Sequence, residues 1–481
     1  MVIDLKKNII YQSAYQLILI LMPLMTSPYL ARTLGPEGLG INSYNYSIVY
    51  YFILIAGLGI SNYGNRSIAA FRDDSRKMAL TFWEILFAHF LLSGAVLFVY
   101  LIYCTLIAEY KVVAFIQTFY VIGAFFDISW FYFGLENFTK VICGNLICKI
   151  ISFISIFLFV KDEGDIFVYV LIISISYMCG YLIQWIFLPS KISWVKLTKK
   201  GVLRHFRPMF ILFLPSIAIS LYKVMDKIML GNMSNISEVA YYTNAEDVIN
   251  IPISIIGAVG TVMLSRTSNL VAKGKIDKSK KYIQDSLGIV SWLSIALMFG
   301  ISAISYNFTI TFWGERFTSC TVLIIILVLT IPFITVANIV RTQYLIPHNK
   351  DFEYLFSIIA GAVINFCINI FLIPILASSG AAIGTVFAEA GVCIIQIMFV
   401  RKDLPILKYL LKNMIYIVFG AIMFCALKII DFQIDNKTIC LFIQIVIGAL
   451  IYIILSLIYL RFLFLKGKFC FDLNTIIKKN K

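Results

Sequence analysis

The chain has 481 residues, of which 61% are hydrophobic and only 14% are charged. Soluble domains are typically about 45–50% apolar and about 25% charged, so a water-soluble fold of this length could not bury so much apolar surface. An aromatic content of 15% also excludes a disordered chain. The class that remains is a multi-pass membrane protein.

Apolar runs of about 20 residues predict fourteen membrane-spanning helices and hence an all-α fold. In chain order the predicted spans are 9–31, 41–62, 80–104, 112–134, 141–160, 166–188, 209–230, 239–264, 287–312, 320–341, 352–374, 379–400, 407–429 and 438–461. The first run holds two prolines and lacks a small-residue cleavage site, so we expect a retained span and not a signal peptide.

The formal charge of +15 is distributed unevenly between the two sides of the predicted membrane. With fourteen spans both termini lie on one side, and that side carries 31 Lys and Arg residues against 6 on the other. The positive-inside rule then places both termini in the cytoplasm, so the charge sets orientation and we expect no nucleic-acid partner. The longest loops, 189–208 and 265–286, are basic and either anchor this topology or bind lipid headgroups or a regulator.

A weak internal repeat at an offset of 200 residues aligns Gly57 with Gly257 and makes spans 1 and 2 resemble spans 7 and 8. The two copies share one orientation, which predicts two six-helix lobes with a substrate cleft between them. The predicted parts are a first lobe at 1–188, a basic interlobe linker at 189–208, a second lobe at 209–400, and helices 13 and 14 with a basic cytoplasmic tail at 401–481.

Ionisable side chains inside the spans are the candidate functional residues, because a charge at mid-membrane costs about 2.5–3.5 kcal/mol. Four cations could bind an anionic headgroup such as a phosphate in the cleft: Arg32, Lys149, Lys223 and Lys227. Seven other groups could bind a coupling ion, H⁺ or Na⁺, or pair structurally: Glu84, His89, Asp127, Asp226, Glu246, Asp247 and Glu389. Glu84 and His89 lie about one helical turn apart and could relay protons, although an interhelical hydrogen bond is the simpler interpretation of His89.

Prolines and polar residues add further expectations for the spans. Four prolines could act as hinges or as static kinks: Pro23, Pro28, Pro215 and Pro252. Asn365 and Asn369, at i and i+4, are expected to join helices. Span 2 carries tyrosines that could stack on sugars or form an interfacial belt: Tyr44, Tyr46, Tyr50 and Tyr51.

The composition disfavours a catalytic or metal site. The 10 cysteines are scattered without a CxxC pair, and the chain has only 3 histidines. No loop is long enough for a soluble catalytic domain, so we expect no enzyme activity, no cofactor and no metal site. A scaffold without a transport role is disfavoured by the intramembrane charges.

Four regions of the chain carry motifs of a known family. They are YLARTLGPEGLG with AGLGISNYGNRSIAAFRDD, FDISWFYFGLENFTKVICGNLICKI, DKIMLG with AYYTNAEDV, and RTQYLIPHNKDFEYLFSIIAGAVINFCINIFLIPILASSGAAIGTVFAEA. In this order they resemble the polysaccharide or O-antigen flippase (Wzx-type) family of the multidrug/oligosaccharidyl-lipid/polysaccharide exporter superfamily, over most of residues 1–400. The matching positions are Arg32, Gly35, Gly59, Arg66, Asp127, Trp130, Glu136, Lys149, Asp226, Asn365, Asn369 and Glu389.

This resemblance implies a MATE-like fold and a flippase of the bacterial plasma membrane. Its substrate would be an undecaprenyl-pyrophosphate-linked oligosaccharide, carried outward by ion-coupled alternating access for O-antigen, capsule or exopolysaccharide assembly. Membrane lipids, a polysaccharide polymerase and a chain-length regulator would be partners. In the related lipid II flippase the last two spans form a groove for the prenyl tail, and spans 13 and 14 could do the same. A multidrug or other small-molecule exporter of the superfamily and a lipid II-type flippase are the alternatives.

Overall fold

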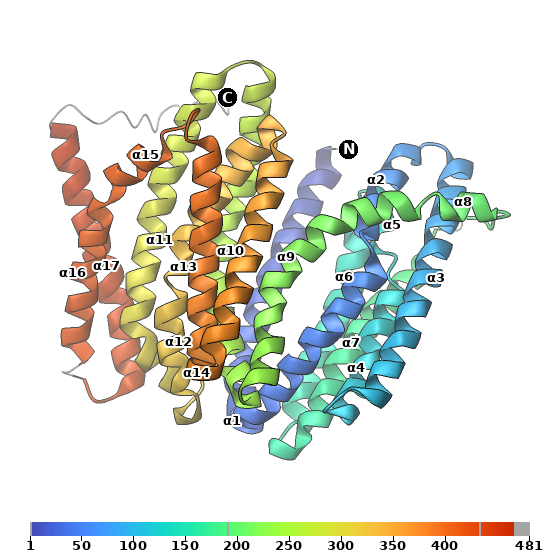
Figure 1. Cartoon of the computed structure of the whole chain (residues 1–481), viewed down its shortest axis with the longest axis horizontal. Helices are drawn as coiled ribbons and strands as arrows, with labels where there is room; N and C mark the ends of the chain where they lie inside the picture. The colour runs from blue at the N-terminus through green and yellow to red at the C-terminus, as the bar shows by residue number, and fades with distance from the viewer. Residues whose placement is uncertain (1, 190–191, 432–433, 466–481) are drawn as a thin grey trace. The chain divides into compact units, whose positions relative to one another are not determined.

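A computed structural model describes residues 2–189, 192–431 and 434–465, and within this part of the chain every regular element is a helix (Figure 1). The elements of the first half are α1 (Val2–Gly57), α2 (Ile60–Phe71), α3 (Ser75–Leu106), α4 (Lys111–Phe125), α5 (Ser129–Gly134), α6 (Phe138–Phe159), η1 (Glu163–Asp165), α7 (Ile166–Ile186), α8 (Lys199–Leu203) and α9 (Phe206–Met233). Those of the second half are α10 (Ile236–Ala272), α11 (Ile276–Phe312), η2 (Glu315–Phe317), α12 (Ser319–Leu327), α13 (Thr330–Val340), η3 (Arg341–Leu345), η4 (Ile346–His348), α14 (Asp351–Val400), α15 (Ile406–Asn413), α16 (Ile415–Asp431) and α17 (Lys437–Leu465).

The predicted spans coincide with these helices, which confirms the all-α membrane fold. In the described part of the chain 9 helices are long and apolar enough to cross a membrane, and Gly144–Phe159 is a shorter apolar helix. Two of the nine are longer than a single span: Leu21–Phe71 covers the end of the predicted span 9–31 and all of 41–62, and Asp351–Val400 covers 352–374 and 379–400. The predicted spans at 209–230 and 239–264 lie on the helices α9 and α10.

The two double-length helices are each broken where one predicted span should give way to the next. In α1 the break is at Gly35, with φ 67° and ψ −178°, a backbone conformation that glycine adopts without a Cβ clash. In α14 it is at Ala377, with φ 49° and ψ −128°. Pro23 and Pro28 lie in continuous helix before the first break, and Pro252 lies inside continuous α10. Hinge motion at these prolines therefore stays a prediction.

The chain divides into two compact units that each combine distant segments. The first comprises Met1–Asp247, Phe312–Leu323 and Leu355–Ala388, and the second comprises Val248–Thr311, Ile324–Tyr354 and Glu389–Lys481. This division follows packing and not chain order, so the lobe and linker boundaries expected from the repeat stay predictions.

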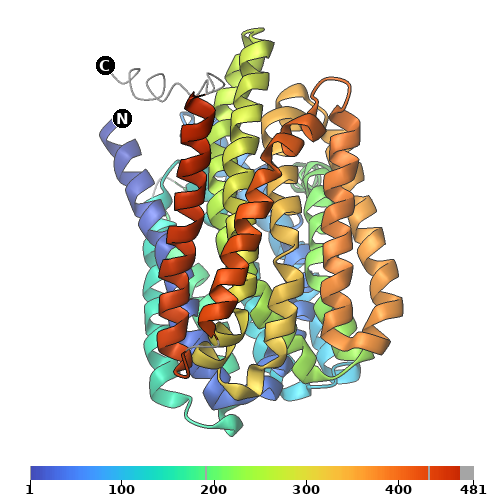
Figure 2. The same cartoon turned by 90° about the vertical axis from the view of Figure 1, so that its left-hand side faces the viewer.

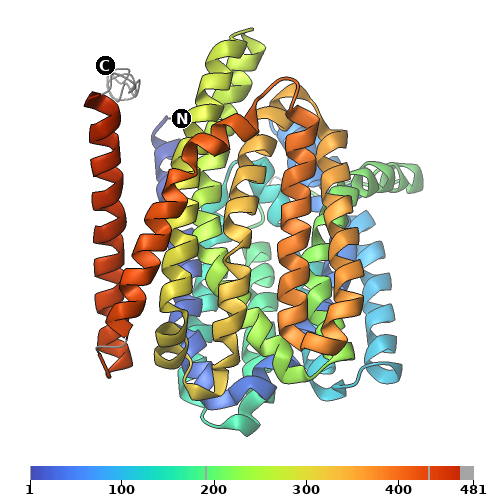
Figure 3. The same ribbon diagram turned by 60° about the vertical axis from the view of Figure 1, so that its left-hand side comes forward.

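Within the first unit, α7 packs against both α4 and α6, and α4 also packs against α1 and α3 (Figure 1). Within the second unit, α16 and α17 form an antiparallel hairpin (Figures 2 and 3). A cluster of buried apolar side chains joins this hairpin to α11: Ala303, Phe419, Met423, Leu427 and Tyr452.

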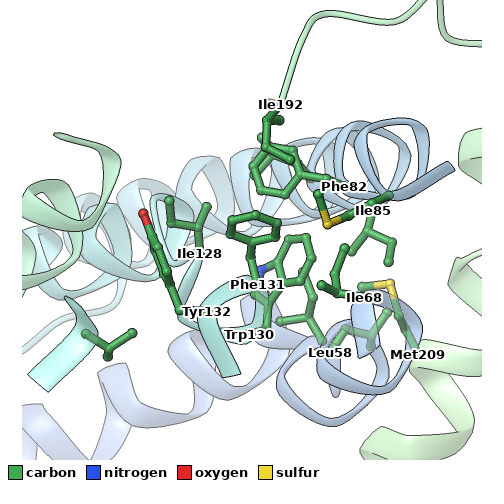
Figure 4. Packing of buried hydrophobic residues seen from close by; sticks show 14 of the residues in the cluster. Leu58, Ile68, Phe82, Ile85, Ile128, Trp130, Phe131, Tyr132, Ile192 and Met209 are labelled. Atoms are coloured by element: carbon green, nitrogen blue, oxygen red, sulfur yellow. The ribbon is translucent and has the colours of Figure 1, made fainter. Parts of the chain in front are cut away.

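A second apolar cluster holds α2, α3 and α5 together in the first unit (Figure 4). Trp130 is fully buried and stacks on Phe82 at a ring-centroid distance of 5.6 Å. The Trp130 ring lies so close to Gly64 that a Cβ on this glycine would be 2.4 Å from Cε3. Met209, at the start of α9, belongs to the same cluster, so the cluster also fixes one end of the helix that carries Asp226.

Candidate functional site

Asp226 on α9 is the most densely coordinated charged residue of the first unit, and its side chain is buried at 1% exposure. Its Oδ2 accepts hydrogen bonds from the Tyr242 and Thr385 hydroxyls at 2.8 Å each. Its Oδ1 accepts from Asn369 Nδ2 at 2.6 Å, and Asn365 Nδ2 lies 3.5 Å from Oδ2. The carboxylate thus links α9 to α10 and α14 through uncharged donors.

The groups around Asp226 also offer oxygen atoms to a small cation. Asn369 Oδ1 is buried and has no hydrogen-bond partner among the described residues. A Cβ on Gly384 would lie 2.2 Å from this oxygen, so the position requires glycine. Among the described residues no three or more His, Cys, Asp or Glu side chains cluster as a metal site. A single carboxylate with neutral oxygens balances one positive charge, which suits a proton or a monovalent cation.

Lys227, the next residue on α9, forms an ion pair with Glu246 of α10. The Nζ–Oε2 distance is 2.9 Å, and the two side chains are 18% and 21% exposed. Glu246 lies one helical turn after Tyr242, so α9 and α10 are joined by two neighbouring contacts, Asp226–Tyr242 and Lys227–Glu246. The predicted cation Lys227 is therefore already neutralised in this conformation. Asp247 is exposed beside this pair.

Lys149 on α6 lines a cavity of about 440 Å³ within the first unit. Its other walls are mainly aromatic and uncharged polar side chains: Tyr46, Tyr120, Tyr177, Tyr181, Asn145, Ser152 and Ser176. Successive rings lie 5.0–5.2 Å apart from Tyr46 through Tyr120 to Tyr177 and Tyr181. Tyr46 also interacts electrostatically with Lys227, which places the Lys227–Glu246 pair near this wall. The arrangement offers one cation and several aromatic faces to a polar ligand.

Arg32, by contrast, lines a different cavity of about 590 Å³ with Tyr29, Lys161 and Glu163. Glu163 of this group forms an ion pair with Arg316. Arg32 and Lys149 therefore do not share one site in this conformation.

Glu84 and His89 do not form a proton relay in the structure. Glu84, although buried, forms an ion pair with Arg204 and accepts a hydrogen bond at 3.1 Å from His205. Burial lowers the pKa of His205 against the opposing effect of Glu84, which favours the neutral imidazole. The positive charge that balances Glu84 therefore comes from Arg204. The second ring nitrogen of His205 accepts from the Tyr63 hydroxyl at 2.7 Å. Both ring nitrogens of His89 lack a hydrogen-bond partner among the described residues.

Asp127 does not line the Lys149 cavity itself, but it lies within electrostatic range of two of its tyrosines, Tyr177 and Tyr181. The Asp127 carboxylate accepts a hydrogen bond at 2.8 Å from the backbone amide of Ser129, the first residue of α5. Glu389 is buried in the second unit. The side chains of Lys223 and Pro215 lie outside the described residues.

The second unit contains an apolar groove between α11, α16 and α17, with a volume of about 280 Å³. Its walls include Trp292, Met423, Leu427 and Tyr452, and Gln444 contributes a polar group. Tyr452 donates its hydroxyl to the Trp292 carbonyl at 2.8 Å, and Trp292 donates to Ser456. The predicted spans 13 and 14 thus form an apolar groove with α11.

Several residues of these sites were not predicted from the sequence. Tyr242 and Thr385 complete the Asp226 site, and a tyrosine or threonine in a span carries no signal by itself. Each does lie four residues before a predicted acid, Glu246 or Glu389, and so shares its helix face. Arg204 and His205, the partners of Glu84, lie in the predicted linker and not in a span.

Comparisons with known proteins agree with this architecture. A family model described as polysaccharide biosynthesis protein matches residues 5–271. A protein of Escherichia coli (strain K12), provisionally assigned as an O-antigen transporter, is 26% identical over 411 residues, covering 83% of this chain and 98% of that protein.

Solved structures share the fold at low sequence identity. The lipid II flippase MurJ in an inward closed conformation has a TM-score of 0.77 at 19% identity, covering 95% of this chain and 100% of that one. An inward-facing multidrug resistance MATE family transporter of the MOP superfamily has a TM-score of 0.62 at 14% identity, covering 83% and 99%. These two matches confirm the predicted MATE-like fold.

Proposed function

We infer the function of this chain from one premise: it belongs to the polysaccharide biosynthesis protein family, whose model matches residues 5–271. It is a multi-pass membrane transporter of the flippase type and not an enzyme, as its sequence predicts. The identity of the cargo, the driving ion and the orientation are the parts that we propose.

The proposed cargo is an undecaprenyl-pyrophosphate-linked oligosaccharide repeat unit, moved from the cytoplasmic to the outer face of the bacterial plasma membrane. It would serve assembly of O-antigen, capsule or exopolysaccharide. The observation that carries this proposal is the Lys149 cavity, because it combines a cation for phosphate with tyrosine rings for sugar faces. A headgroup of this kind cannot cross about 30 Å of hydrocarbon without such a polar path.

The apolar part of the cargo needs a separate surface. The groove between α11, α16 and α17 offers one with walls that are almost entirely apolar, and we assign it to the prenyl chain. Burial of apolar surface contributes about 25 cal/mol per Å², so even part of a prenyl chain in this groove would add affinity. A polysaccharide polymerase and a chain-length regulator are proposed partners that would receive the translocated unit.

Transport against a gradient requires an energy source, and the proposed binding site of the driving ion is Asp226. Binding of H⁺ or Na⁺ would neutralise Asp226 and change its bonds to Tyr242, Thr385 and Asn369. Because these partners lie on α10 and α14, occupancy would alter how three helices are joined. Alternating access would follow from such a change, with both termini on the cytoplasmic side.

The experiment that tests the cargo is deletion of the gene with analysis of lipid-linked intermediates and surface glycan. We expect complete repeat units to accumulate on the cytoplasmic face while surface polysaccharide is lost. A plasmid-borne copy of the gene should clear the accumulated units and restore the surface polysaccharide. A multidrug exporter would change drug resistance and leave surface glycan normal. A lipid II-type flippase would instead cause lysis with accumulation of the cell-wall precursor. Either of these results would replace the proposed cargo.

A further inference from the structure

Two adjacent contacts join α9 to α10 within the first unit. One pairs a carboxylate with a neutral hydroxyl, and the other pairs an ammonium group with a carboxylate. Asp226 binds the Tyr242 hydroxyl, which is neutral, whereas Lys227 binds the Glu246 carboxylate at 2.9 Å. Lys227 is half-buried and is also within electrostatic range of Asp247 and Asp226. Around this one ammonium group there are thus three carboxyl groups.

This surplus of carboxyl groups conflicts with a simple role for Lys227 as a phosphate ligand. An anionic headgroup that approached the pair would meet Glu246 and Asp247 as well as the ammonium. An anion can bind Lys227 only by taking the position of the Glu246 carboxylate. The pair is accessible to such an exchange, because its two side chains are 18% and 21% exposed and it lies near Tyr46 of the Lys149 cavity.

We propose that Glu246 is a specificity-determining residue that competes with the phosphate of the cargo for Lys227; this rests on the proposed function. A phosphate group presents more acceptor oxygens and a higher charge than a single carboxylate, so it can displace Glu246. A neutral headgroup cannot displace it, and a sugar carboxylate would only exchange one carboxylate for another. The Glu246–Lys227 pair therefore selects phosphate-bearing cargo and rejects other glycolipids.

Displacement also explains how cargo binding could reach the Asp226 site. Once released, Glu246 would be a partly buried carboxylate without its cation, a costly state that favours movement of α10. Tyr242 lies one turn earlier on the same helix and holds Asp226, so a movement of Glu246 would be transmitted to this bond.

The test measures binding of inorganic pyrophosphate to the purified full-length chain in detergent by titration calorimetry. Removing the competing charge in Glu246→Gln should tighten pyrophosphate binding roughly tenfold, since an uncompensated partly buried cation attracts anions strongly. Glu246→Asp keeps the charge and should bind like the wild type. Lys227→Met should bind more weakly than the wild type. Glucuronate, offered as a carboxylate-only probe, should bind wild type at least tenfold more weakly than pyrophosphate does.

Asp247→Asn is the matched control, because it removes a neighbouring negative charge that is not bonded to Lys227. We expect it to tighten pyrophosphate binding by less than about threefold, through the general field alone. Equal gains in Glu246→Gln and Asp247→Asn would overturn the proposal, as would no gain in Glu246→Gln with an unchanged melting midpoint. If lipid-linked repeat units are transported normally in that case, only the role of Glu246 fails. If the wild type neither binds pyrophosphate nor transports such lipids, the proposed function fails with it.

Discussion

Asn369 donates its side-chain amide to the carboxylate of Asp226 at 2.6 Å, although 143 positions separate the two residues in the chain. This bond, with those from Tyr242 and Thr385, holds an acidic group in a setting without a directly paired cation among its hydrogen-bond partners. A membrane protein keeps such a group only at a cost, which favours a functional role.

Neutralising Asp226 should separate its charge from its structural role. Asp226→Asn keeps the side-chain volume and one of the two acceptor oxygens but cannot bind a cation by charge. We expect transport in vesicles to fall at least tenfold and to lose its dependence on an imposed H⁺ or Na⁺ gradient. Asp277→Asn, at an exposed carboxylate on α11, is the control and should leave transport unchanged. Full gradient-dependent transport by Asp226→Asn would exclude this residue as the ion site.

Removing the cation of the Lys149 cavity should weaken cargo binding without unfolding the protein. Lys149 has an exposed side chain and no ion-pair partner among the described residues, so Lys149→Met leaves no carboxylate unpaired. We expect surface polysaccharide in a deletion strain to be restored to less than about a tenth of the wild-type amount. Lys278→Met, on the exposed start of α11, should restore it fully. Equal restoration by both variants would remove Lys149 from the binding site.

The packing of α2 on α5 predicts a strong effect of a single methyl group. In Gly64→Ala the new Cβ would be 2.4 Å from Trp130 Cε3, so a buried ring must shift. Overpacking of this kind costs about 1–3 kcal/mol, which should appear as a lower melting midpoint in detergent. Gly288→Ala, on α11, has nothing within 4 Å of the new methyl and should be neutral or stabilising by about 0.4–1 kcal/mol. A similar loss in both variants would contradict the packing described for Trp130.

His205 predicts the direction of a pH effect on stability. Burial lowers its pKa below the ordinary value of 6.5, so it is neutral in the folded protein at pH values where the unfolded chain binds a proton. Its contribution is therefore fully present above about pH 6.5 and is lost as the pH falls below this value. We expect the melting midpoint of the wild type to decrease between pH 7 and pH 5, and His205→Gln to show a smaller decrease. Parallel curves for the two proteins would contradict the assignment.

The proposed orientation can be tested with an impermeant thiol reagent. Ser234 is exposed at the end of α9, on the side expected to face outward, and Lys275 is exposed between α10 and α11 on the opposite side. We expect Ser234→Cys to label in intact cells and Lys275→Cys to label only after the membrane is opened. Labelling is compared with the parent chain, because Cys367 and Cys425 are exposed on the protein surface. The reverse pattern would invert the topology.

The helices were predictable because the membrane imposes a run of apolar residues on every span, and each predicted range lies on helix. The expected role of Asn365 and Asn369 in joining helices agrees with their bonds to Asp226, since amides one turn apart must find polar partners in a membrane. The pattern could not show which of several carboxylates pairs with Lys227. That choice depends on the distance between α9 and α10, and the hydropathy of the sequence contains no information about this distance.

Two expectations failed for a similar reason. Closeness in sequence suggests Glu84 and His89 as partners, but Glu84 contacts Arg204 and His205, which are about 120 residues away. Charge alone groups Arg32 with the lysines, whereas the structure places it on a separate cavity. Proximity along the chain and likeness of charge do not determine contacts between helices.

The central claim, that the chain flips a pyrophosphate-linked prenyl oligosaccharide, is tested most directly in proteoliposomes. Purified protein is reconstituted with a labelled lipid of this kind, and an impermeant glycosidase reports the fraction of headgroups exposed outside over time. We predict that the wild-type chain makes the internal headgroups accessible within minutes, and that Lys149→Met and Asp226→Asn are each at least tenfold slower. Accessibility that equals that of protein-free vesicles, in wild-type protein that melts cooperatively, would contradict the account.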